Sequence, residues 1–248
     1  MESSYRWNGI DLEAVSTRPV APVVALDSWL VRDGHTVALE QHVARFSAAA
    51  GAPPNDFWKH VVQKIPHDGD WFPRVERLAE DESDELYVTL RPAPQRTETA
   101  TVWTAPEDPR LTPTVKGPDL LRLGTLREQA QHHGADEALV LAGGYVAEGA
   151  YSTVLAWWED RGEVWSLDAP RVPSVTEQVV LELCRARGLS TRLVPATPTD
   201  LAGAELWILS ALHGLRHVTQ WVEGPPVASV SALHRELQEE WWGSAVPL

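Results

Sequence analysis

The segment "GADEALVLAGGYVAEGAYSTVLAWWEDRGEVWSL" (Gly134–Leu167) consists of short apolar runs separated by glycine-containing turns. Each run is of strand length, and the pairs Gly143-Gly144 and Arg161-Gly162 are typical of tight turns. The segment therefore predicts consecutive strands joined as antiparallel hairpins.

Helical patterns flank these strands. Residues 119–134, "DLLRLGTLREQAQHHG", have helical character, and Ser174 with Glu177 three residues later opens the apolar run "VVLELC". This S-x-x-E spacing is a capping box, and Gly188 supplies the expected stop. Strands are also expected in "STRLVPA" and "ELWILSALHG", with a last helix in "SALHRELQEEWW". The second half is thus a mixed α/β (α+β) structure.

The first third also mixes strands and helices. Residues 22–34 are rich in β-formers and end in Asp-Gly, whereas 36–51 have helical spacing. Arg45 falls near the apolar face of that helix, so its guanidinium must find a partner or extend to solvent. We expect two further helices, at 54–65 and 69–80, and then strands in "ELYVTLRP" and "TATVWTAP".

A connector interrupts these patterns. Residues 105–118, "APEDPRLTPTVKGP", contain four prolines and show no periodicity. We therefore predict a small N-terminal α/β domain over 1–107, an interdomain connector over 108–118, and a larger C-terminal α/β domain over 119–248.

Composition excludes several classes of function. A net charge of −14 argues against nucleic acid or an anionic membrane as the main partner. No apolar run approaches 18 residues, so the cytoplasm is the expected location. Cys184 is the single cysteine, which excludes an intrachain disulfide, and its apolar helical setting favours a buried thiol. No metal site is expected, because the adjacent His132 and His133 lack the usual ligand spacing.

Lys116 is the most informative candidate residue. The chain has three lysines, and this one ends the proline-rich connector. A desolvated lysine amine can attack a carbonyl carbon, a helix N-terminus can bind phosphate, and a carboxylate can keep a pyridinium nitrogen protonated. These three groups would be supplied by Lys116, by the capped helix start at Ser174 and by Glu148. Periodicity does not show that they lie close together in space.

Several motifs together are similar to the class IV aminotransferases, the fold-type IV pyridoxal phosphate (PLP) enzymes. "DGHTVALEQHVARF" resembles the family element "dG…leeHl.Rl", and "VKGPDLLRL" followed by "GADEALVLAGGYVAEGAYSTVLAW" resembles "hK…G.deal.ld..G.v.E.s.sNif". "PSVTEQVVLELCRARG" and "LWILSALHGLRHV" occupy the places of two later elements. The resemblance runs from about Ala25 to Val222 and keeps its order.

The resemblance implies a cofactor site between the two domains. Lys116 would form the Schiff base with PLP, Glu148 would pair with the pyridinium nitrogen, and Arg45 would bind the phosphate. Backbone N–H groups of Val175 and Thr176 would also bind the phosphate. Ser210 and Ala211 would close the same side of the cofactor.

Substrate contacts follow less directly. Arg91, Arg96 and His213 are candidate substrate-binding residues, because substrate carboxylates need arginine or other donors. The resemblance also implies a small-molecule amino substrate and a homodimer.

Three functions remain open. The first is a PLP-dependent aminotransferase of amino acids or amines, and the second is a 4-amino-4-deoxychorismate lyase-type enzyme that releases pyruvate and forms p-aminobenzoate. The third is a non-catalytic relative, motivated by departures from the family pattern: Thr153 replaces an asparagine, Glu177 replaces an arginine, and "ALDSWLV" stands in place of "GDGvFE".

Overall fold

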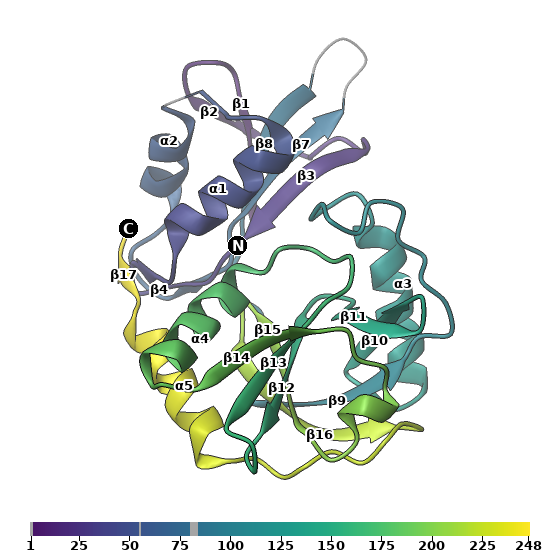
Figure 1. Ribbon diagram of the computed structural model, residues 1–248. Coiled ribbons are helices and arrows are strands. Elements are labelled where there is room, and N and C mark those ends of the chain that lie inside the picture. Colours follow the sequence, from purple (N-terminus) through teal and green to yellow (C-terminus); the bar gives the residue numbers. More distant parts are fainter. Residues whose placement is uncertain (1, 55, 80–83) are drawn as a thin grey trace. The chain divides into compact units, whose positions relative to one another are not determined.

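The computed structural model describes residues 2–54, 56–79 and 84–248 of the chain. It divides into two compact units (Figure 1). The first comprises Met1–Gln95, Val115–Pro118 and Ser244–Leu248, and the second comprises Arg96–Thr114 and Asp119–Gly243. Residues 96–107, expected in the N-terminal domain, therefore belong to the second unit, and the last five residues return to the first.

Within its described residues, the first unit contains two antiparallel sheets and two helices. Its strands are β1 (Ser3–Trp7), β2 (Leu12–Val15), β3 (Val23–Ser28), β4 (Val31–Arg32), β5 (His35–Thr36), β6 (Asp70–Trp71), β7 (Arg74–Ala79), β8 (Asp84–Leu90) and β17 (Val246–Pro247). The strand orders are β2-β1-β8-β7-β3 and β17-β5-β4-β6. The helices α1 (Leu39–Ala50) and α2 (Phe57–Lys64) contribute Phe46 and Phe57 to the core of this unit.

One expected helix of the first unit is wrong. Residues 69–80 were predicted to be helical, but the structure forms β6 and β7 there. Pro73 lacks an N–H group and disfavours helical backbone at Phe72, which weakens a helix across this point. β7 pairs with β3 on one side and β8 on the other, so ladder hydrogen bonds override the helical spacing. The expected helices at 36–51 and 54–65 are confirmed as α1 and α2.

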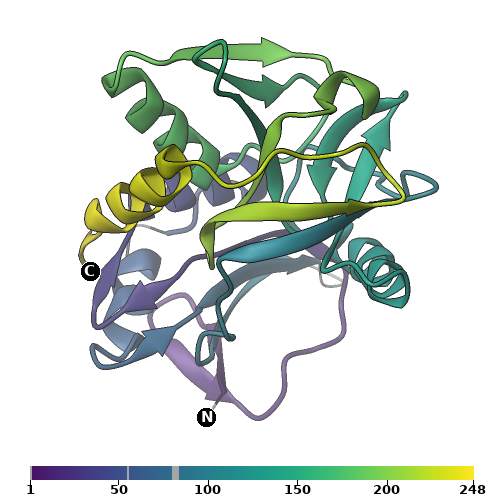
Figure 2. The same ribbon diagram turned by 90° about the horizontal axis from the view of Figure 1, so that it is seen from below.

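The second unit is built on one eight-stranded mixed sheet. Its strands are β9 (Thr99–Thr104), β10 (Glu137–Ala142), β11 (Tyr145–Gly149), β12 (Thr153–Trp158), β13 (Glu163–Leu167), β14 (Ser190–Val194), β15 (Glu205–Ser210) and β16 (Gly214–Val222), in the order β11-β10-β9-β16-β15-β12-β13-β14. Figure 2 shows β9 and β16 side by side although more than 100 residues separate them. The predicted hairpins β10–β11 and β12–β13 are confirmed.

Three helices and one short 3₁₀ turn complete the second unit. They are α3 (Leu120–His132), α4 (Val175–Ala186), α5 (Ala232–Gly243) and η1 (Thr199–Leu201). α3 packs on β10, whereas α4 and α5 pack on each other (Figure 1). Cys184 of α4 is fully buried, and burial raises its thiol pKa to about 11, which agrees with an inert buried thiol.

Strand directions gather several chain segments at one edge of this sheet. β9, β10, β12 and β16 begin there, and β11, β13, β14 and β15 end there, as the parallel and antiparallel pairings require. We call it the Glu148 edge, because Glu148 lies one residue before the end of β11. The segment after β13, which leads into α4, and the turn between β15 and β16 lie at the same edge.

No helix within the described ranges is long and apolar enough to span a membrane.

Gly117 fixes the segment that carries Lys116 within the first unit. The Lys116 carbonyl accepts a hydrogen bond from the Leu26 N–H at 2.8 Å, so the segment lies on β3. Gly117 has φ +132°, and a Cβ at this position would approach the Leu26 nitrogen to 2.9 Å and Val23 Cγ1 to 2.8 Å. Only glycine meets both constraints.

Gly117→Ala should therefore destabilise the protein by about 2–4 kcal/mol, since backbone strain adds to a steric clash. Gly143→Ala is the matched control, because Gly143 has φ +60° but a Cβ added there would meet nothing within 4 Å. The control should cost about 1 kcal/mol. Urea unfolding measures both values, and equal losses would contradict the close approach to β3.

Candidate functional site

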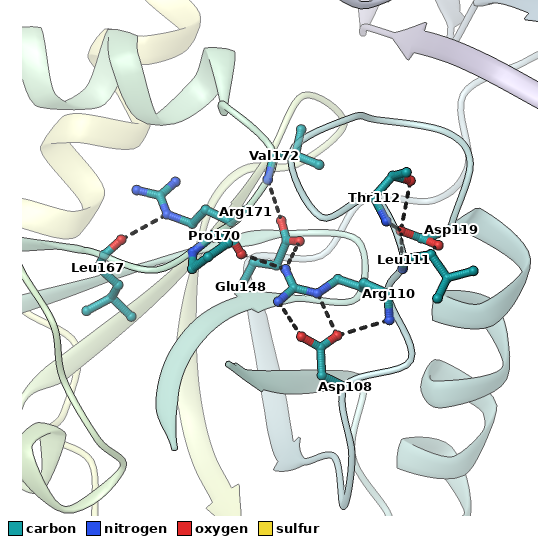
Figure 3. Close-up of polar contacts among 10 residues, drawn as sticks. All are labelled: Asp108, Arg110, Leu111, Thr112, Asp119, Glu148, Leu167, Pro170, Arg171 and Val172. Carbon is teal, nitrogen blue, oxygen red and sulfur yellow. Dashed lines mark hydrogen bonds and ion pairs between the residues drawn. The ribbon is translucent and has the colours of Figure 1, made fainter. Parts of the chain in front are cut away.

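Glu148 is a buried carboxylate held by an arginine (Figure 3). Its side chain is 6% exposed, and Oε1 accepts a hydrogen bond from Arg110 Nη1 at 2.6 Å. Oε2 accepts a longer bond from the Val172 N–H at 3.3 Å. A buried carboxylate needs such charge-assisted donors to remain ionised, so the Glu148 edge contains a stable negative charge.

Arg110 is itself fixed from several directions. Its side chain is 1% exposed and pairs with Asp108 through both Nε and Nη2, each at 2.8 Å, while Nη1 also donates to the Pro170 carbonyl. Burial opposes the charge on Arg110, but the two carboxylates outweigh burial and raise its pKa. The guanidinium is therefore a permanent cation between Asp108 and Glu148.

The proline-rich segment before Lys116 is ordered by Asp119. This buried carboxylate accepts hydrogen bonds from the backbone N–H groups of Leu111 and Thr112 at 2.8–3.0 Å (Figure 3). Asp119 immediately precedes α3, so the start of that helix anchors the loop that contains Arg110. Part of the expected connector is thus a fixed component of the second unit.

The first turn of α4 presents backbone donors at the Glu148 edge. Ser174 caps the helix, and its Oγ accepts the Glu177 N–H at 3.2 Å. The first four N–H groups of a helix lack intrahelical partners, so those of Val175 and Thr176 are available to an anion. Both residues are buried.

Glu177 does not complete the expected capping box. Its carboxylate pairs with Arg171 at 2.5 and 2.9 Å and accepts the Ser166 hydroxyl at 2.7 Å. A bidentate guanidinium is a stronger partner than the Ser174 N–H, which explains the difference. Arg171 thus compensates the negative charge of Glu177.

Ser210 and Ala211 lie where β15 turns into β16. Ser210 Oγ accepts the His213 N–H at 3.3 Å, and the Thr97 N–H donates to His213 Nδ1 at 3.1 Å. Gln238 of α5 bonds the His213 carbonyl and the Leu215 N–H at 2.8 and 2.7 Å. Hydrogen bonds with Thr97 and Gln238 therefore fix the turn between β15 and β16.

Arg45 and Lys116 belong to the first unit. Asp27 on β3 is fully buried and accepts bonds from Arg45 Nε at 2.8 Å, Arg45 Nη2 at 2.7 Å and His42 Nδ1 at 2.8 Å. Burial raises the pKa of Asp27, but Arg45 and His42 outweigh burial and hold it well below its usual range. Burial lowers the pKa of His42, and the nearby charge of Lys116 contributes to this lowering. Lys116 is half-buried.

The predicted site residues therefore fall into two groups. Lys116 and Arg45 share the first unit. Glu148, Val175, Thr176, Ser210, Ala211, Arg96 and His213 share the second unit, and all of these lie at or next to the Glu148 edge. Arg91 lies in the first unit, where Nε donates to the Phe72 carbonyl at 3.1 Å and the guanidinium stacks over the Phe72 ring.

Sequence reasoning missed Arg110 and Asp27. The signal for Asp27 was present, since a carboxylate inside the apolar strand "VVALDSWL" requires a cation and Arg45 required a partner. The signal for Arg110 was weaker. Its segment lacks periodicity, and nothing local indicates that Glu148 lies 38 residues along the chain but 2.6 Å away.

Arg110→Leu should destabilise the protein by about 3 kcal/mol at neutral pH, because Glu148 would stay buried without its cation. Adding Glu148→Gln to this variant should restore part of the loss. Arg122→Gln is the control, since its side chain is 52% exposed and should contribute little. Denaturant unfolding provides the comparison, and a double variant no more stable than Arg110→Leu would contradict the pairing.

Asp27→Asn should lower the free energy of unfolding by about 2–4 kcal/mol at pH 7. The folded pKa of Asp27 is depressed, so its stabilisation is present above the unfolded value of about 3.9 and is lost as the pH falls toward the folded value. The difference in free energy of unfolding between wild type and Asp27→Asn should therefore become smaller below pH 4. Asp68→Asn, at an exposed position, is the control and should have the same free energy of unfolding as wild type. A loss of stability in Asp27→Asn that does not change with pH would contradict the depressed pKa of Asp27.

Known proteins resemble this chain in sequence and in fold. A family model for amino-transferase class IV matches residues 25–221. No curated protein matches the sequence. The chain is similar to a fold IV-transaminase from Curtobacterium pusillum (TM-score 0.81, 17% identity, 97% of each chain covered).

Two further solved structures have known ligands. A hypothetical aminotransferase from Mycobacterium tuberculosis, with α-ketoglutarate and PMP bound, has a TM-score of 0.81 and 19% identity, covering 96% of this chain and 98% of that one. An aminotransferase from Brucella abortus bound to PLP has a TM-score of 0.80 and 18% identity, covering 97% and 98%. These likenesses confirm the expected α/β fold of fold type IV. Because the family model covers most of the sequence, the chain belongs to the class IV aminotransferase family.

Proposed function

We propose that this protein is a PLP-dependent aminotransferase that acts on an amino acid or amine through Lys116. The observation that carries the proposal is the buried Glu148 carboxylate, which Arg110 keeps ionised at the same sheet edge as the start of α4. A carboxylate with this environment suits a protonated pyridine nitrogen. Similar proteins with bound PLP and PMP support the choice of cofactor.

The residues of this chain fit the parts of PLP. The N–H groups of Val175 and Thr176 and the guanidinium of Arg45 would hold the phosphate, while Ser210 and Ala211 would border it. Asp27 fixes the Nε and Nη2 side of Arg45, which holds the guanidinium in one orientation on α1. When bound, PLP supplies an aldehyde that bonds amines and a ring that stabilises negative charge on the adjacent carbon.

Each protein group has a distinct task. Lys116 Nζ would hold the cofactor, and as a free amine it would remove and return the proton on the substrate α-carbon. Glu148 would keep the ring nitrogen protonated, and Arg110 is the cation that pairs with Glu148. Arg96 and His213 at the Glu148 edge are the proposed substrate contacts of the second unit. Arg91 remains a prediction on the first unit, and so do the cytoplasmic location and the homodimer.

The test is reduction of the protein with borohydride after incubation with PLP, followed by peptide mass mapping. The chain has only Lys59, Lys64 and Lys116, so the labelled lysine is unambiguous. We expect the label on Lys116, and Lys116→Arg should lose it together with roughly 10²–10⁴-fold or more of the activity, because the general base is removed. Lys59→Arg should retain both.

Product analysis separates the remaining functions. A keto acid formed from an amino donor and 2-oxoglutarate would support transamination. Pyruvate formed from aminodeoxychorismate without such transfer would instead assign the lyase-type reaction. Failure to label Lys116 would overturn the proposal in favour of a non-catalytic relative.

A further inference from the structure

Glu137 is a buried acidic residue at the Glu148 edge that has no part in the cofactor contacts proposed above. It is the first residue of β10 and is 1% exposed. Burial raises the pKa of Glu137, against the opposing charges of Arg216 and Arg127. A buried carboxyl group lowers stability unless it makes specific hydrogen bonds, so the contacts of Glu137 indicate what it does.

The carboxyl group of Glu137 binds the turn that follows Glu148. Its Oε2 accepts the Ser152 hydroxyl at 3.1 Å and, over a longer distance, the Tyr151 N–H at 3.4 Å. Ser152 is buried as well, so water does not readily replace the hydrogen bond between these two side chains. Glu137 therefore joins the start of β10 to the segment between β11 and β12.

Strand pairing explains why Glu137 reaches this turn. β10 and β11 are antiparallel, and Leu139 lies opposite Gly149, the last residue of β11. Glu137 precedes Leu139 by two residues, so its side chain leaves the same face of β10 at a point beyond the end of β11. The Ala150 N–H donates to the Ala138 carbonyl at 2.8 Å. The turn is thus bound by both the side chains and the backbone of β10.

Gly149 allows the turn to pack directly on Glu137. A Cβ at this position would lie 3.0 Å from Glu137 Cγ and 2.2 Å from Ser152 Oγ, so any side chain would disturb the contact. The Gly149 N–H also donates to the Ser152 carbonyl at 2.8 Å, which closes the turn. Because Gly149 directly follows Glu148, a displacement of this turn also displaces the backbone that carries the Glu148 carboxylate.

A β-bulge makes the position of Glu148 depend on this turn. Glu148 pairs with Val140, but Val146 pairs with Leu141, so Ala147 is an extra residue in β11. The bulge interrupts the regular ladder immediately before Glu148, and two residue pairs lie between the bulge and the turn. With the ladder interrupted on one side, the backbone at Glu148 depends on the turn on its other side.

We propose that Glu137 is a positioning residue that sets the place of the Glu148 carboxylate at the sheet edge by holding the turn after β11. Arg110 fixes the Glu148 side chain, while Glu137 fixes the backbone from which that side chain starts. A carboxylate that must meet a ring nitrogen needs both, since a displacement of about 1 Å is costly at such a contact. What Glu148 binds rests on the proposed function, whereas how Glu148 is held does not.

Hydrogen exchange followed by mass spectrometry tests, without PLP, how the turn is held. In Glu137→Ala, the amide groups of residues 148–152 should exchange roughly tenfold faster than in wild type, the effect of losing about one buried hydrogen bond. Glu205→Ala is the matched control, because Glu205 is also a buried acidic residue but starts β15, at the opposite edge of the sheet. This control should leave the exchange of residues 148–152 close to that of wild type.

A double-variant comparison tests whether Glu137 acts through Glu148. Glu137→Ala should weaken the affinity for PLP roughly tenfold in the wild-type background, but less than about twofold when Glu148→Gln is already present. A merely structural role would cause the same loss in both backgrounds, as Glu205→Ala should. Glu137→Gln keeps an acceptor oxygen and should retain most of the affinity. Quenching of tryptophan fluorescence by PLP provides the dissociation constants.

These measurements separate failure of this inference from failure of the proposed function. Equal losses of PLP affinity in both backgrounds, or unchanged hydrogen exchange in folded Glu137→Ala, would overturn the role of Glu137. If Glu137→Ala does not fold, Ser152→Ala replaces it, since it removes one donor to Glu137 and should show the same dependence on Glu148. A wild-type protein that does not bind PLP would contradict the proposed function, and hydrogen exchange alone would then decide whether Glu137 holds the turn.

Discussion

The need to keep buried carboxylates ionised governs the arrangement of this protein. A carboxylate removed from water remains charged only if donors replace its hydration, and guanidinium groups do so most effectively. Asp27 has Arg45, Glu148 has Arg110 and Glu177 has Arg171, each within 2.5–2.8 Å. In each of these three pairs the cation is an arginine, whose planar guanidinium can bind a carboxylate through two nitrogens.

The sequence allowed much of the second unit to be predicted. Gly143-Gly144 and Arg161-Gly162 marked the hairpins, and Ser174 marked the start of α4, because these signals act over a few residues. The helix expected at residues 69–80 was wrong for the opposite reason. Their strand is determined by β3 and β8, which lie far along the chain, and local spacing contains no information about those partners.

The same distinction between local signals and long-range partners holds for the candidate site. Glu148 and the start of α4 were predicted through motifs, and strand pairing brings them to one edge of the sheet. Arg110 was missed, because its importance depends on Glu148, which lies far along the chain, rather than on its neighbours in sequence. Glu177 shows the limit of motif reading most clearly. A capping-box spacing correctly located the helix, yet the carboxylate itself binds Arg171.

The assignment of Val115–Pro118 to the first unit has a consequence for how the chain can be divided. Together with the return at Ser244–Leu248, it means that the polypeptide passes from one unit to the other at positions 95/96, 114/115, 118/119 and 243/244. No single cut of the chain separates the two units. A fragment that contains the whole eight-stranded sheet also contains Val115–Pro118, the segment with Lys116. Separate production of the first unit would therefore require three stretches of the chain to be joined, so the two units are tied to each other by chain connectivity alone.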